Sequence, residues 1–240
     1  MDVEPWRHFY ESELNSLWAL VALPALFLVY AATRGRERAA RAADREARFV
    51  FAWSVAFALE TIADPLATGP LARALALSDA AKQAVMLVFV LLGDFRVLLI
   101  ALPLALGTAH LARAALASAG QTLVVPLAAW TTDAALRARW PALPGQVLWL
   151  VYELGFFAFA LALRAAVLPR LAGGSAVPRP RVPRAILAYA AAYYALWALA
   201  DVLILAGLDA GWLLRVLPNQ LYYAVFVPFA FTLYFGARRP

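Results

Sequence analysis

The 240-residue chain contains no cysteine. Disulfides, thiolate zinc sites and cysteine nucleophiles are therefore excluded. Histidine is almost as scarce: His8 and His110 are the only two, and their separation in the sequence argues against a histidine-based metal centre or a haem site. We expect no cofactor. An all-oxygen site for Mg²⁺ or Ca²⁺ stays open, although no loop carries a recognised calcium pattern and we assign no metal ligand.

Charge is also sparse, because only 15% of the residues are charged whereas 65% are hydrophobic. A soluble domain has about 45–50% apolar residues, so a water-soluble core cannot absorb this excess. At about 20 residues per crossing, the length allows at most eight or nine membrane spans and leaves no room for a second, soluble domain. We therefore expect residues 1–240 to form a single transmembrane domain.

Hydrophobic runs of spanning length predict an all-α, polytopic membrane helical bundle with about seven transmembrane helices. The acidic start Met-Asp-Val-Glu-Pro lacks the basic residues of a cleavable signal peptide, so the first run is expected to be retained. The fourth run is the weakest, because Gly120, Gln121 and Pro126 interrupt it. The runs cover residues 14–32, 49–68, 83–107, 114–132, 146–168, 185–207 and 218–236.

The loops differ in their basic residues, and this difference predicts the direction of insertion. With seven spans, fourteen basic residues fall on one side and six on the other. The bias places the N-terminus outside and the C-terminus in the cytoplasm. Since Lys82 is the only lysine and alanine is abundant, the composition is typical of a GC-rich bacterial genome and favours a bacterial inner membrane. The net charge of +6 does not indicate nucleic acid, because the arginines flank apolar runs.

The first cytoplasmic connector, residues 34–48, holds six arginines interleaved with Glu37, Asp44 and Glu46. We interpret it as a solvated helical connector that touches anionic lipid headgroups.

Ionisable side chains inside the spans are costly and usually mark function. All the carboxylates inside the spans fall in the outer half of the predicted membrane or close to its midplane. This distribution predicts a polar cavity that opens toward the outer side. Repulsion and desolvation favour keeping one or two of these acids protonated. The residues concerned are Glu60, Asp64, Asp94, Arg96, Glu153 and Asp201.

Spacing along the helices supports an inward-facing site. Glu60 and Asp64 are four residues apart and share a helix face. The last span begins with polar and phenolic residues that would lie at the same outer level. Tyr222 and Tyr223 are open to a second interpretation as part of an interfacial aromatic belt. The candidate substrate-binding residues are Glu60, Asp64, Arg96, Glu153, Asn219, Gln220, Tyr222 and Tyr223.

Three short motifs occur in order: Gly93-Asp94 in the third span, Ala200-Asp201 in the sixth and Tyr222-Tyr223 in the seventh. In these motifs the chain resembles the lysoplasmalogenase family of multispan membrane hydrolases. It differs from that family in having Asp64-Pro65 instead of an early Lys-Pro pair, in Arg96 after the Gly-Asp, and in seven rather than eight spans.

The resemblance implies hydrolysis of the vinyl-ether bond of a lysoplasmalogen by two carboxyl groups. Asp94 and Asp201 would be the catalytic pair, with the acid not assigned between them, and Arg96 would suit a phosphate. The partners expected are therefore membrane lipids and a lipid or other hydrophobic small-molecule substrate; the oligomeric state is left open.

Three other kinds of function stay open. Glu60 in the second span is similar to the acid of small seven-span terpene cyclases, in which aromatic residues shield a carbocation. A proton- or cation-coupled transporter would also use buried carboxylates and prolines in spans, although the sequence shows no inverted repeat. A receptor, scaffold or assembly factor is a further possibility. A retinal-binding pump of the usual kind is excluded, because the last span contains no lysine.

Overall fold

The computed structural model describes residues 4–42, 44–167 and 181–236. Within these residues every regular element is helical and no strand occurs, as expected for an all-α chain. The elements are α1 (Pro5–Glu11), η1 (Leu14–Trp18), α2 (Ala19–Tyr30), η2 (Ala31–Gly35), α3 (Arg36–Ala42), α4 (Arg45–Leu66), η3 (Ala67–Leu71), α5 (Ala72–Ala74), α6 (Asp79–Leu106), η4 (Thr108–His110), α7 (Leu111–Thr122), α8 (Val124–Arg139), α9 (Gln146–Ala162), η5 (Leu163–Val167), α11 (Arg181–Leu205), α12 (Ala210–Asn219), η6 (Gln220–Val225) and α13 (Phe226–Gly236).

Seven helical segments of the described chain are long and apolar enough to cross a membrane, so the predicted number is confirmed. They identify the chain as a multi-pass membrane protein. The segments are Leu14–Ala42, Arg45–Ala74, Asp79–Leu106, Thr108–Arg139, Gln146–Ala166, Arg181–Leu205 and Ala210–Gly236. Exposed side chains agree with this, because Leu26, Leu116 and Trp130 are each at least 65% exposed, which suits a lipid-facing surface.

Sequence features explain where several helices begin and end. The Asp44 carboxylate accepts a hydrogen bond from the Ala47 amide at 2.7 Å and caps α4. Ser78 caps α6 in the same way. Gly107, with φ +84°, ends α6 in a conformation that favours glycine. The weak fourth run is divided between α7 and α8 near Leu123, and the seventh segment begins at Ala210 rather than at residue 218.

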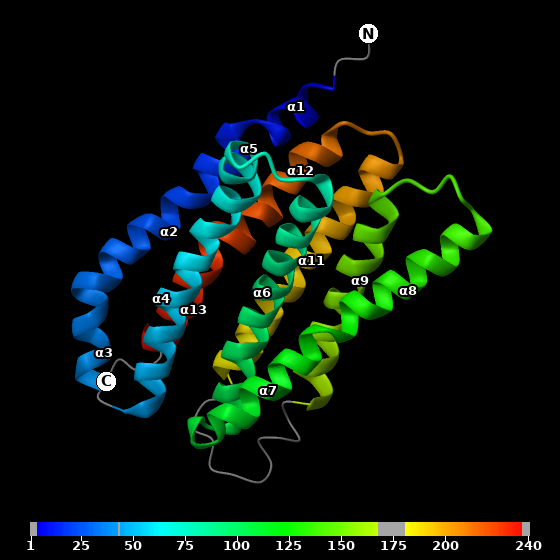
Figure 1. Ribbon diagram of the computed structural model, residues 1–240. Coiled ribbons are helices and arrows are strands. Elements are labelled where there is room, and N and C mark those ends of the chain that lie inside the picture. The colour runs from blue at the N-terminus through cyan, green and yellow to red at the C-terminus, as the bar shows by residue number, and fades with distance from the viewer. Residues whose placement is uncertain (1–3, 43, 168–180, 237–240) are drawn as a thin grey trace.

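The long helices pack side by side around α11, which contacts α9, α12 and α6. On one flank α2 packs against α4 and η6, and on the other α8 packs against α9 (Figure 1). The short helix α1 lies against α12 at one end of the bundle, while α3 and the end of α13 lie at the opposite end (Figure 1). The direction in which the bundle is inserted stays a prediction.

Candidate functional site

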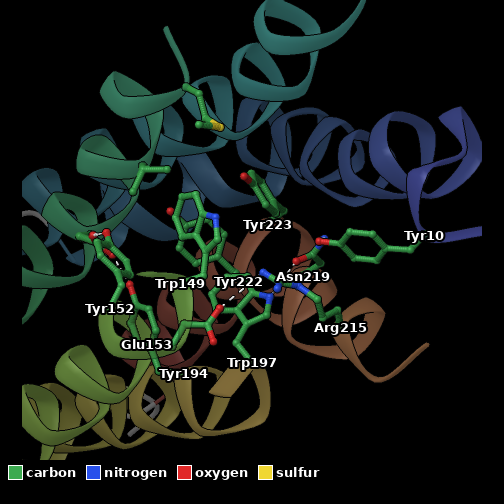
Figure 2. A pocket seen from close by; sticks show the side chains of 13 residues that line it. Tyr10, Trp149, Tyr152, Glu153, Tyr194, Trp197, Arg215, Asn219, Tyr222 and Tyr223 are labelled. Atoms are coloured by element: carbon green, nitrogen blue, oxygen red, sulfur yellow. Dashed lines mark hydrogen bonds and ion pairs between the residues drawn. The ribbon is translucent and has the colours of Figure 1, made fainter. Parts of the chain in front are cut away.

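A cavity of about 240 Å³ lies between α1, α6, α9, α11, α12 and η6 (Figure 2). Most of its lining is aromatic, and Asp94 and Glu153 are its acids. We call it the aromatic pocket. It is lined by Tyr10, Met86, Val90, Asp94, Trp149, Tyr152, Glu153, Tyr194, Trp197, Arg215, Asn219, Tyr222 and Tyr223.

Asp94 is held by two tyrosine hydroxyls from neighbouring helices. The Tyr152 hydroxyl of α9 donates to Oδ2 of Asp94, and the Tyr194 hydroxyl of α11 donates to Oδ1. Asp94 is only 2% exposed, yet its carboxylate reaches the pocket. Both oxygens thus act as acceptors, an arrangement that suits an ionised carboxylate.

Gly93 lets Tyr222 approach the backbone of α6. A Cβ built on Gly93 would overlap the Tyr222 hydroxyl. The Tyr222 ring is also enclosed by Trp197, whose centroid lies 5.1 Å away, and by Tyr193 at 5.5 Å. The Gly-Asp motif therefore combines a small residue that admits the ring with a carboxylate one position later.

We expect Gly93→Ala to lower the free energy of unfolding by about 1–3 kcal/mol, because the added methyl group overpacks the contact with Tyr222. Gly120→Ala is the matched control, since nothing lies within 4 Å of its Cβ position in α7. Thermal unfolding in one detergent compares the two. Equal melting temperatures would contradict this account of the glycine.

Arg96 is fully buried behind the pocket rather than in its lining. Its guanidinium donates to the Tyr222 carbonyl at 2.6 Å and to the Thr61 hydroxyl at 2.8 Å, and it pairs with Glu60 at 3.2 Å. Its Cζ lies 4.1 Å from the centroid of the Tyr222 ring. Arg96 thus fixes η6, and with it the two tyrosines that face the pocket.

Arg215 joins two carboxylates on different helices. Its guanidinium pairs with Asp201 of α11. It also pairs, at 3.4 Å, with Glu153 of α9 (Figure 2). Asp201 is fully buried and Glu153 is 3% exposed. Oε2 of Glu153 and Oδ2 of Asp201 are buried without a hydrogen-bond partner among the described residues. Two carboxylates therefore share one cation beside the pocket, an arrangement we call the Arg215 cluster.

Helix α1 covers the pocket at the end of the bundle. Asp209 accepts hydrogen bonds from the backbone amides of Trp6 and Arg7 at 3.0 and 3.2 Å, which fixes the start of α1. The Asn219 amide donates to the Tyr10 hydroxyl at 3.2 Å and accepts from the Trp197 indole at 2.9 Å. Tyr10 is thereby held in the pocket wall.

The structure brings together some of the candidate residues from the sequence and separates others. Asp94, Glu153, Asn219, Tyr222 and Tyr223 line the aromatic pocket. Asp201 does not line the pocket and is linked to it through Arg215 and Glu153. The other candidates are not lining residues: Glu60 and Arg96 pair with each other, Asp64 is buried and interacts with Thr68 and Tyr223, and Gln220 begins η6.

The pocket also contains Arg215, Tyr152, Trp149 and Tyr10, which the sequence pattern does not single out. The apolar run at 218–236 leaves Arg215 in a predicted loop, but the residue lies in α12. The sequence does contain a signal for Arg215. Two acids in spans, Asp201 and Glu153, require a cation, and Arg215 lies four residues before the candidate residue Asn219, on the same helix face. The tyrosines could not be assigned, because aromatic residues are equally common in core packing.

No protein-family model, curated protein or solved structure matches the chain. The resemblance to lysoplasmalogenases therefore stays a prediction based on three short motifs, and the functional argument depends on the pocket.

Proposed function

We propose that this chain is a membrane-embedded enzyme that acts on a lipid-like substrate by carboxylate acid/base chemistry, and that the substrate is the vinyl ether of a lysoplasmalogen. The main support is that Asp94 and Glu153, from two different helices, face the same aromatic pocket. The choice of substrate depends on the Gly93-Asp94, Ala200-Asp201 and Tyr222-Tyr223 motifs.

Asp94 suits the anionic role. Because both of its oxygens accept from tyrosine hydroxyls, a proton on this carboxyl would compete with one of those hydrogen bonds. An ionised Asp94 stabilises a positive charge that develops on the substrate and orients the attacking water.

The Arg215 cluster suits the acidic role. Its two carboxylates and single guanidinium leave one negative charge in excess in a buried place, and one shared proton removes that excess. Glu153 lines the pocket and has an oxygen without a partner, so it delivers the proton, while Asp201 lies behind it. This differs from the sequence-based assignment, in which Asp201 itself acts on the substrate.

The reaction then balances as follows. The proton from Glu153 adds to the alkenyl carbon that is β to the ether oxygen and gives an oxocarbenium ion next to Asp94. Water attacks the cationic carbon and loses a proton to a carboxylate, which gives a hemiacetal. The hemiacetal collapses to an aldehyde and a chain-free glycerophosphodiester whose former ether oxygen is now a hydroxyl, and the site regains its proton. The same division between an acid and a carboxylate operates in glycoside cleavage.

Aldehyde release from a defined lysoplasmalogen tests the proposal. We expect turnover by the purified protein, and a loss of about 10²-fold or more with Glu153→Gln, because the amide cannot donate the required proton. Asp133→Asn is the control, since Asp133 is a buried span carboxylate that binds Arg137 outside the pocket. A chromatographically monodisperse wild-type protein with no turnover, or a Glu153→Gln variant with full turnover, would reject it.

The aromatic lining supports one alternative, an integral membrane terpene cyclase. Seven aromatic side chains line the pocket, namely Tyr10, Trp149, Tyr152, Tyr194, Trp197, Tyr222 and Tyr223. Such rings stabilise a carbocation through their faces. A protein that is inactive on lysoplasmalogens but cyclises a prenyl epoxide, with the same dependence on Glu153, would favour this reaction.

A further inference from the structure

The end of the bundle opposite the aromatic pocket carries a separate group of arginines. The first membrane segment, Leu14–Ala42, has 29 residues and is therefore about 44 Å long as a helix. The hydrocarbon core of a bilayer is only about 30 Å thick. The arginines of this segment, Arg34, Arg36, Arg38 and Arg41, all fall in its last turns, so we expect α3 to extend into the headgroup layer. The start of α4 packs beside α3 (Figure 1).

A groove of about 420 Å³ lies between α3 and the first turns of α4. Arg36 and Arg48 line it, and both are exposed. Its remaining lining is apolar and consists of Ala39, Ala40 and the half-buried Phe51. Two guanidinium groups therefore face an apolar floor, which matches a phosphate joined to an acyl chain.

The acids of the same connector are engaged elsewhere. Asp44 caps α4, Glu46 accepts a hydrogen bond from the Tyr234 hydroxyl at 2.9 Å, and Glu37 pairs with Arg41 at 3.6 Å. No carboxylate is among the residues that line the groove, and neither Arg36 nor Arg48 has an ion pair within the described part of the chain. The two charges are thus available for a ligand.

A neighbouring cavity of about 330 Å³ is a weaker candidate. It contains Arg34, Arg38 and Arg41, but Glu37 also lines it, and the Arg38 guanidinium already donates to the Tyr30 hydroxyl at 3.2 Å. Its one aromatic residue is Tyr30, whose hydroxyl is engaged by Arg38, whereas the groove at Phe51 is lined by wholly apolar side chains besides its two arginines.

We propose that the groove between Arg36, Arg48 and Phe51 is a binding site for an anionic phospholipid. The phosphate lies between the two guanidinium groups, which suit phosphate oxygens through paired N–H donors. The first part of an acyl chain lies against Phe51. This site is independent of the chemistry at the aromatic pocket. It would bind anionic phospholipids specifically, in addition to the non-specific electrostatic attraction between the basic connector and the membrane.

Native mass spectrometry of the delipidated protein, titrated with phosphatidylglycerol or phosphatidylcholine, tests the site. We expect phosphatidylglycerol to bind at least about tenfold more tightly than the zwitterionic lipid. Arg36→Gln combined with Arg48→Gln should remove this preference and weaken phosphatidylglycerol binding at least about tenfold, because the charge-assisted hydrogen bonds from the two guanidinium groups to the phosphate are lost.

The matched control removes the same charge elsewhere. Arg113 and Arg164 are exposed and lie on the same predicted side but do not line the groove, so Arg113→Gln with Arg164→Gln should change the affinity by less than about twofold. An equal loss in the control variant would show diffuse attraction and overturn the proposal. Soluble glycerol 3-phosphate binding as tightly as phosphatidylglycerol would also overturn it, because the apolar floor would then contribute nothing. Equal binding of phosphatidylglycerol and phosphatidylcholine by the wild-type protein would likewise overturn the proposal, and this measurement needs no substitution.

Discussion

Asp94→Asn should abolish aldehyde release while the protein stays folded. The substitution keeps the size of the side chain but removes the negative charge that the proposed oxocarbenium ion requires. It also replaces one acceptor oxygen by an amide donor, so one of the hydroxyls of Tyr152 and Tyr194 loses its acceptor. We expect a fall in kcat/KM of at least about 10²-fold, within the range for acid/base groups.

The two tyrosines provide a graded check of this assignment. Tyr152→Phe and Tyr194→Phe each remove one hydrogen bond to Asp94 and leave its charge, so each should cost less activity than Asp94→Asn. Asp133→Asn serves again as the remote control and should keep full activity. The role of Asp94 would be wrong if both phenylalanine variants were as inactive as the asparagine variant, because the tyrosines would then carry the chemistry themselves.

Removing Arg215 should have the largest effect on stability. Arg215→Gln leaves Glu153 and Asp201 buried without their shared cation. Breaking a buried ion pair from one side typically costs about 3–5 kcal/mol, because the remaining charge is uncompensated. The free energy of unfolding, measured by titration with a denaturing detergent, gives the value.

A second substitution distinguishes a charge effect from a simple loss of packing. Because Glu153 holds the shared proton, Asp201→Asn in the Arg215→Gln background removes the negative charge that Arg215 compensates, so it should restore a large part of the lost stability. Arg73→Gln is the surface control, because Arg73 pairs with Glu13 where both side chains are at least 60% exposed, and it should cost less than about 1 kcal/mol. A double variant no more stable than Arg215→Gln would contradict the proposed cluster.

The bundle itself could be predicted because its signal is spread over many residues. Long apolar runs broken by Gly, Pro and charge determine the number of spans almost independently of how the helices pack. Asp94 and Glu153 could also be selected, because an acid in an apolar run has few structural uses. Both line the pocket.

Partners between helices could not be predicted in the same way. The sequence does not show that Arg96 binds Glu60 and the Tyr222 carbonyl, since these contacts join residues of different spans. Arg215 was missed for a related reason. The apolar run predicts that the last span begins at residue 218, eight residues after the actual start at Ala210, so Arg215 falls in a predicted loop instead of the span. The packing of the helices against one another, rather than the hydrophobic periodicity within each helix, determines which polar side chains come into contact.

In the proposed reaction the aromatic pocket transfers a proton to a carbon atom of its substrate. Turnover of a lysoplasmalogen in D₂O, with immediate reduction of the aldehyde and mass analysis, measures this step directly. We expect one deuterium on the carbon next to the former carbonyl in each product molecule, and no product from Asp94→Asn. Aldehyde without deuterium, or no turnover by the folded protein on any alkenyl or prenyl substrate, would contradict it.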